Sequence, residues 1–352
     1  MTRSLLAVLV IFVALTTPAC SLRSDEGPEV VLRAQGSQGG TVSDAELGRS
    51  AAIIDERLDQ AGIDATVTQR TGSVVIRLAR DGGADAERAI ELSTKTGLLE
   101  FYDLEANLLS PSRDAAGSPV ATESLYHLLA GRQPRVGEED EVDTWYLFDP
   151  AKRLAGGPSP TRRLLLPSGG LLDGWRLLGL PPKSAVLVCG IGEVVCPGVN
   201  EASPRSDSYY LVKHDPPTVP ELDGGDLELE GTRHEFDTTT GEPIVVIQFT
   251  DEGAKRFGEI TNREADRGRL VFNLTGGTDP INTYQHFAIV LDREIKSWPS
   301  IDWQQYPNGI SGSNGVQITG IGDLQESKDL ALVLQAGALP VRFEVVPPAP
   351  GG

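Results

Sequence analysis

The stretch Gly241–Val346 constrains the fold most, because strand-like and helix-like patterns alternate along it. Residues Ile244–Phe249 form an apolar run rich in β-branched side chains, which is typical of a strand. Thr250 or Asp251 then supplies an N-cap oxygen, and apolar residues follow at helical spacing. Asp323 is placed to cap a second helix in the same way. The pattern predicts the order strand, helix, strand, strand, helix, strand, which is an α+β arrangement.

The N-terminal part of the chain shows a second alternation of strands and helices. Strands are predicted at residues 29–34, 65–70, 74–79 and 98–102, and helices at 44–61 and 85–96. This βαββαβ order is typical of a ferredoxin-like arrangement, a small split sheet with helices on one face.

Four pieces of the stretch Gly241–Val346 carry a resemblance to a known family. They are GEPIVVIQFTDEGAKRF, FAIVLDREIKSWPSI, SGSNGVQITG and SKDLALVLQAGALPVRFEVV, in this order. They resemble the first large extracytoplasmic domain of SecD, the accessory subunit of the general protein-export channel. Residues 51–79 and 96–104 resemble the base of the same domain. The resemblance implies a ferredoxin-like base whose final strand returns from residues 341–346, with an α+β head inserted into it.

The resemblance and the composition together divide the chain. The predicted parts are a signal peptide at 1–19, a tether at 20–28, a SecD-like base at 29–104, an unrecognised Gly/Pro-rich insertion at 105–220, a SecD-like head at 221–338, a returning base strand at 339–346 and a tail at 347–352. The insertion is an irregular middle segment, and it is either an elaborated insertion with short strands or a partly mobile region. Its aromatic segment Trp145–Phe148 is either a binding patch or a buried strand.

The N-terminus has the features of an export signal. The apolar run Leu5–Leu15 is shorter than the roughly 20 residues that span a bilayer. Ala19 before Cys20 resembles bacterial lipoprotein signals, in which the cysteine is acylated, although Thr17 and Pro18 depart from the usual residues. Cys20 is therefore predicted as a lipid attachment site, which would hold the chain outside the cytoplasm on the cell membrane. Plain secretion after cleavage at Ala19 and an uncleaved anchor are the alternatives.

The acidic balance of the chain excludes some partners. The 352 residues include 50 Asp and Glu against 31 Lys and Arg, a formal net charge of −19. A nucleic acid needs a basic face, so no nucleic-acid partner is expected. The same charge argues against electrostatic adhesion to an anionic membrane surface. No carboxylates follow a calcium-loop pattern, so the charge indicates a soluble exported surface rather than a dedicated cation site.

The sequence contains no recognisable catalytic motif. The four histidines are scattered, and HExxH, CxxC, GxSxG and phosphate-loop patterns are all absent. No catalytic residue, cofactor or metal is predicted, and the chain is expected not to be an enzyme. Cys189 and Cys196 are predicted to form a disulfide outside the cytoplasm, with a redox-active pair as the alternative.

Candidate binding residues lie on the head helix and on a glycine-rich loop. Lys255 and Arg256 belong to the predicted helix, and Ser313 and Asn314 lie in the loop Asn308–Gly315. The resemblance implies that the head faces emerging polypeptide, so these four residues are candidate polypeptide contacts. The alternatives are solvated side chains on the helix and a hairpin connection with positive φ in the loop.

The resemblance implies a non-enzymatic function in protein export. The chain is expected to bind translocating or newly exported polypeptide, or subunits of the export channel. SecD continues into membrane-spanning helices that this sequence lacks, so proton-coupled motor activity is not expected. The head is expected to move against the base through residues 223–229 and 337–340. An envelope scaffold lipoprotein that reuses the fold, unrelated to export, is the first alternative, and a hydrolase of envelope polymers is the second.

Overall fold

The computed structural model describes residues 27–36, 41–79, 83–119, 123–135, 137, 141–166, 170–190, 196–199, 206–277, 279–321 and 323–346. These residues form helices and four β-sheets, which confirms the α+β fold class. The predicted signal peptide, Cys20 and the predicted tail lie outside the described residues.

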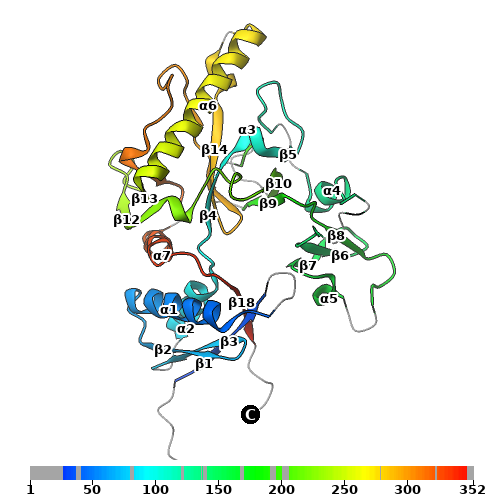
Figure 1. Cartoon of the computed structure of the whole chain (residues 1–352), viewed down its shortest axis with the longest axis vertical. Coiled ribbons are helices and arrows are strands. Elements are labelled where there is room, and N and C mark those ends of the chain that lie inside the picture. Colours follow the sequence, from blue (N-terminus) through cyan, green and yellow to red (C-terminus); the bar gives the residue numbers. More distant parts are fainter. Residues whose placement is uncertain are drawn as a thin grey trace, which may run out of the picture.

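The base is a four-stranded antiparallel sheet with two helices on one face (Figure 1). Its order is β18-β1-β3-β2, with β1 at Glu29–Gln35, β2 at Ala65–Arg70, β3 at Ser73–Leu78 and β18 at Arg342–Val346. Helices α1 (Asp44–Gln60) and α2 (Gly83–Thr94) bury apolar side chains against this sheet. The fourth strand therefore comes back from the far end of the chain, as the resemblance implies.

Strand β4 (Leu99–Asp103) differs from the prediction, which made it the last strand of the βαββαβ base. It lies in the large sheet instead, between β11 (Leu222–Asp223) and β14 (Gln285–Leu291). All five of its residues are buried, so both of its faces need cover, whereas the base sheet has helices on one face only. Exposed and buried residues alternate at the start of β18, which suits that half-covered sheet better.

The large sheet joins strands from three predicted parts of the chain. Its order is β11, β4, β14, β15 (Glu294–Ser297), β9 (Ser184–Cys189), β10 (Ser208–Lys213) and β5 (Leu108–Ser110), and β16 (Ser300–Ile301) pairs with β14. The described residues of the insertion thus form short strands, the first of the two alternatives for residues 105–220. The sequence did not predict that β9 of the insertion pairs with β15 of the head.

The head contains a second sheet and the long helix α6 (Asp251–Thr275). The sheet has the order β12-β13-β17, with β12 at Leu227–Phe236, β13 at Pro243–Phe249 and β17 at Val316–Ile318. Thr250 caps α6, and the buried Phe257 stacks on Phe249 with ring centroids 5.1 Å apart. Asp323 caps helix α7 (Leu324–Gln335). Both predicted head helices are confirmed.

Helix α7 belongs to two hydrophobic cores. Leu332 and Val333 pack in the core of the base. Leu330, Ala331 and Leu334 pack in the core of the head. Because well-packed interiors deform little, a single helix buried on both sides fixes the head to the base.

A small three-stranded sheet projects to the right in Figure 1. Its order is β7-β6-β8, with β6 at Trp145–Phe148, β7 at Leu154–Ser159 and β8 at Arg176–Gly179. Together with helix α5 (Arg162–Leu165) these strands form what we call the side lobe, residues 145–179. Every residue of β6 is buried, which confirms the buried-strand interpretation of Trp145–Phe148. Helix α4 (Leu125–Ala130) packs between the side lobe and the large sheet, and α3 (Leu104–Asn107) follows β4.

Candidate functional site

Two chain segments cross between the base and the rest of the molecule, and Arg57 of α1 binds both. Its guanidinium donates to the carbonyls of Leu92 (2.9 Å), Lys95 (2.5 Å) and Thr96 (3.3 Å) in the first crossing. It also donates to the Gly337 carbonyl in the second crossing, at 2.7 Å. The end of a helix leaves carbonyls without partners inside the helix, and a cation is favourable there. Arg57 is fully buried, and burial lowers its pKa to about 10.

Asp292 holds the first crossing from the other side. It lies in the turn between β14 and β15 with φ of 52°, and its carboxylate accepts from the Leu98 amide (2.8 Å) and the Gly97 amide (3.2 Å). Gly97 has φ of 74°, and a Cβ there would lie 2.8 Å from the Arg57 guanidinium. Only glycine fits this conformation and this close approach without strain. The crossing is therefore a tightly bonded junction.

A further ion pair links the base to the head. Arg88 of α2 donates to both carboxylate oxygens of Asp329 on α7, with a shortest distance of 2.6 Å. The same guanidinium donates to the Ala61 carbonyl at 3.0 Å. This ion pair adds a polar contact between α2 and α7 to the packing of α7 in the two cores.

Buried carboxylates gather where α6 meets β4 and α3. Arg267 donates to Asp103 at 2.5 Å, and His286 lies 2.7 Å from Glu105. Glu264 is fully buried, and neither of its carboxylate oxygens has a hydrogen-bond partner among the residues that the structure describes. Burial, followed by the charges of Asp103 and Glu105, raises the pKa of Glu264 well above its ordinary value. Burial therefore favours the neutral form of this carboxyl inside the head.

A second charged cluster lines a cavity of about 520 Å³ beside the junction. Arg293 donates to Glu100 (2.7 Å) and to the Tyr102 hydroxyl (2.8 Å). Burial, with a contribution from Arg293, lowers the pKa of His214 to about 4, so the imidazole is neutral at physiological pH. Each charge here has a partner within the chain. Among the described residues, no group of three or more His, Cys, Asp or Glu side chains is placed to hold a metal ion.

The four predicted polypeptide contacts fall into two sets. Lys255 is exposed on α6, and Ser313 and Asn314 are exposed on the 3-10 turn η5 (Gly312–Asn314). A Cβ at Gly312 would lie 2.6 Å from the Cα of Ala254, so this turn packs against the first turns of α6. Arg256 instead donates to Asp226 at 2.8 Å and to the Glu221 carbonyl at 2.5 Å. Arg256 therefore fastens α6 to the preceding 3-10 turn η3 (Gly224–Asp226).

The glycine-rich loop is not the hairpin that the sequence suggested. It leads from β16, which pairs with β14 of the large sheet, to β17, which pairs with β13 of the head sheet. Gly309 and Gly315 do have positive φ values, of 80° and 71°. The loop crosses between two sheets and packs on α6, because Thr261 donates to the Ile310 carbonyl and accepts from the Ile310 amide.

The far end of α6 presents apolar side chains that the sequence analysis missed. Leu270 is 56% exposed, Leu274 76%, and Ile281 of the following turn η4 (Pro280–Thr283) 62%. We call these three residues the head tip; α6 reaches the top of the molecule in Figure 1. Below them, Phe272 packs on Trp303 with ring centroids 5.3 Å apart. The sequence signal was the run LVFNL (270–274), which has more apolar residues than one buried helical face can accept.

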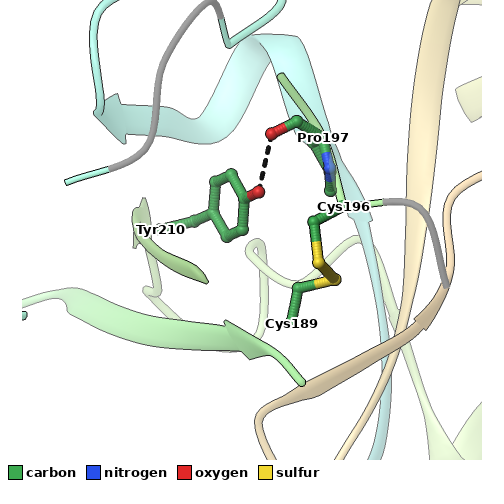
Figure 2. The surroundings of a disulfide bond; sticks show 4 residues. All are labelled: Cys189, Cys196, Pro197 and Tyr210. Atoms are coloured by element: carbon green, nitrogen blue, oxygen red, sulfur yellow. Dashed lines mark hydrogen bonds between the residues drawn. A yellow bond between two sulfur atoms is a disulfide. The ribbon is translucent and has the colours of Figure 1, made fainter. Parts of the chain in front are cut away.

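Cys189 and Cys196 are joined by a disulfide that faces the core of the large sheet (Figure 2). Both cysteines are fully buried. The Tyr210 hydroxyl donates to the Pro197 carbonyl at 2.6 Å, directly after the second cysteine. The disulfide and this bond hold the ends of the intervening loop against β9 and β10.

The fold and its surfaces define a class of protein: a two-part α+β domain with a ferredoxin-like base, a returning final strand and a head. The particular family follows from comparison with known proteins. The family model for the SecDF P1 head subdomain matches residues 200–341. The chain is SecD-like: over these residues it is similar to the head subdomain of the SecDF P1 domain.

Relatives of known name support the same assignment. The chain is 22% identical over 348 residues to the protein translocase subunit SecD of Acidaminococcus fermentans, covering 97% of the chain and 50% of that relative. It is 26% identical to SecD of Rhodothermus marinus, covering 85% of the chain and 46% of the relative. The protein translocase subunit SecDF of Bacillus subtilis is 34% identical over 125 residues, which are 35% of the chain and 16% of that protein. The chain thus spans about half the length of the first two relatives.

Solved structures of SecDF are also similar. A crystal structure of SecDF in a super-membrane-facing form aligns with a TM-score of 0.48 and 20% identity, covering 91% of the chain and 29% of the SecDF chain. A structure described as a membrane component SecDF that enhances protein export aligns with a TM-score of 0.47 and 19% identity, over 91% of this chain and 98% of that one. Within the part of the chain that the structure describes, we find no helix with the length and apolar character needed to cross a bilayer.

Proposed function

We propose that this chain is a non-enzymatic domain of protein export, which binds extended apolar segments of translocating or newly exported polypeptide at the head tip. The observation that carries the proposal is the exposure of Leu270 and Leu274, four residues apart on α6, and of Ile281 on η4, the turn that packs on the same helix. Exposed apolar side chains that gather on one surface mark interaction sites. The SecD relatives, named as protein translocase subunits, supply the class of ligand.

Contacts within the head hold the head tip in a fixed position. Gly268 lets α6 approach the Trp303 ring, since a Cβ there would lie 2.8 Å from Trp303 Cδ1. The Trp303 indole donates to the Thr283 hydroxyl at 3.1 Å, which fixes η4 beside the helix. A fixed apolar surface loses little conformational entropy when an unfolded segment binds to it. Lys255, Ser313 and Asn314 lie at the other end of α6 and remain candidate contacts along the path of the same polypeptide.

The division of the chain and its anchoring belong to the same proposal. We place the base at residues 29–98 and 339–346, the head at 221–338, and the insertion in between. Acylation of Cys20 would tether this domain to the outer face of the cell membrane, and export-channel subunits would be its neighbours there. Motion of the head against the base would have to break the Arg57 bonds to both crossings, so we expect the two parts to move as one body while those bonds hold.

The test is binding of the purified chain to a fluorescent apolar peptide and to a permanently unfolded, reduced precursor protein, followed by anisotropy. Replacing the three residues of the head tip by serine should weaken binding at least about tenfold, since burying each side chain contributes on the order of 1.5–3 kcal/mol. The matched control replaces three apolar residues exposed elsewhere, Leu229, Phe236 and Leu324, and should bind as the unmodified chain does. Equal loss in both variants, or none in either, would remove the head tip from the proposal.

A further inference from the structure

We infer that the side lobe is a membrane-surface binding element, which docks on anionic phospholipid headgroups through exposed arginines and leucines. The inference is independent of polypeptide binding, because the side lobe and the head tip lie on different parts of the molecule (Figure 1).

The side lobe exposes a group of leucines. Leu154, Leu164, Leu171 and Leu172 are between 45% and 65% exposed. The strand register gathers three of them at one end of the small sheet, since Phe148 of the central strand pairs with Leu154 on one side and Arg176 on the other. Leu171 and Leu172 lead into Arg176, and the Trp175 amide donates to the Leu172 carbonyl at 3.1 Å.

The same segment is basic within an acidic chain. Residues 149–180 carry five cationic side chains and two carboxylates, a local net charge of +3 in a chain of −19. Arg176 is exposed at the end of the sheet where Leu154 lies, and Arg163 is exposed next to Leu164 in α5. Arg153 is 80% exposed and pairs with Asp149 at 2.7 Å. Arg162 lies over the Trp145 ring at 4.0 Å, and Lys152 lies over the Tyr126 ring at 5.1 Å.

Leucines beside arginines on a projecting element fit a bilayer surface. Apolar side chains enter the boundary between headgroups and acyl chains, while arginines keep their charge at the phosphates. Each cation near an anionic membrane strengthens binding by roughly fivefold. The negative charge of the other parts does not prevent this contact, because charges more than about 8 Å away are screened at physiological ionic strength. The net negative charge of the chain excludes electrostatic binding of its whole surface to an anionic membrane. The local excess of cations permits such binding at the side lobe.

The experiment measures co-sedimentation of the full chain with vesicles, using Cys20→Ser so that no acyl chain contributes. Vesicles of phosphatidylglycerol and phosphatidylethanolamine are compared with vesicles of phosphatidylcholine, at low and at physiological salt. We expect binding to the anionic vesicles alone, weakened by salt. The triple variant Arg153→Glu/Arg163→Glu/Arg176→Glu should bind at least about a hundredfold more weakly. Leu164→Ser/Leu171→Ser/Leu172→Ser should bind more weakly and with a steeper salt dependence, because only the charges remain.

Arg49, Arg263 and Lys328 provide the matched control, since they are exposed cations outside the side lobe. Their replacement by glutamate changes the net charge equally and should leave vesicle binding within about threefold of the unmodified chain. Near-ultraviolet circular dichroism checks that each variant is folded. Equal weakening in both charge variants would overturn the inference, as would absence of binding to anionic vesicles at low salt. Capture of one acidic envelope protein by the side lobe, without vesicle binding, would also overturn it.

Discussion

Two ionisable side chains are fully buried but have opposite surroundings: Arg57 at the base–head junction and Glu264 in the head. Arg57 stays charged because four backbone carbonyls surround it. Glu264 has no hydrogen-bond partner, and its pKa is raised well above the ordinary value. The difference shows that the junction depends on a buried charge for its bonding, whereas burial in the head favours the neutral form of a carboxyl that makes no hydrogen bond to the described residues.

The largest expected effect is at the junction. Arg57→Ala should lower the free energy of unfolding by about 3–5 kcal/mol, because it removes a charged, buried donor that binds four backbone carbonyls at the junction. Denaturant titration measures the change. Arg49→Ala, an exposed position on the same helix, is the control and should change it by less than about 0.5 kcal/mol. If the two variants were equally stable, the junction would not depend on the buried charge.

The disulfide is a covalent link whose contribution to the free energy of unfolding can be compared with that of Arg57. Replacing Cys189 and Cys196 by serine should lower the free energy of unfolding by about 2–3 kcal/mol, less than the loss of Arg57, because the closed loop is short. Denaturant titration of the double variant provides the value. If the double variant lost more free energy of unfolding than Arg57→Ala does, the disulfide would stabilise the fold more than the junction does.

The head should respond to pH in the direction set by Glu264. A carboxyl with a raised pKa in the folded state stabilises the fold at low pH, and that contribution is lost as the pH rises above the ordinary value of 4.5 towards the folded pKa. Glu264→Gln should remove this pH-dependent loss of stability, which amounts to about 1.4 kcal/mol per pH unit over that range. The variant should therefore be more stable than the unmodified chain at neutral pH.

Unfolding at a series of pH values between about 5 and 8 separates Glu264 from its neighbours. Burial also raises the pKa values of Glu100, Asp103 and Glu221, so a smaller slope of the same sign should remain in the variant. Identical slopes in the two proteins would mean that Glu264 is ionised in the fold and has a partner.

The smallest effect is expected for the ion pair between α2 and α7. Arg88 and Asp329 keep 29% and 10% of their side-chain surface exposed, so solvent screens their attraction in part. A double-mutant cycle with alanine at both positions should give a coupling free energy of about 1 kcal/mol. A coupling free energy as large as the effect of Arg57→Ala would mean that the ion pair on α7 contributes as much to the junction as Arg57 does.

The sequence predicted local structure better than the connections between distant segments. The caps at Thr250 and Asp323 follow from side-chain chemistry next to the helix start, and both are present. The place of β4 depends on which strands, distant in sequence, cover its two faces, and periodicity does not reveal that.

The sequence analysis missed the base–head junction and the two exposed surfaces, the head tip and the side lobe, for different reasons. Arg57 interrupts the apolar stripe of its helix, and that interruption was the available signal for a buried charge. Predicting the head tip would have required knowing where α6 leaves the core. Predicting the side lobe would have required the net charge to be counted for each region and not over the whole chain. Arg256 was assigned to a surface because its partner Asp226 lies 30 residues earlier.

The most direct test of the central claim is photocrosslinking in intact cells from Leu274, with Leu324 as an equally prepared exposed position away from the head tip. Mass spectrometry then identifies the captured proteins. The account predicts that Leu274 captures many different exported chains and that Leu324 does not. Capture of a single envelope protein from Leu274, with no exported chains, would contradict it and favour a scaffold that reuses the SecD-like fold.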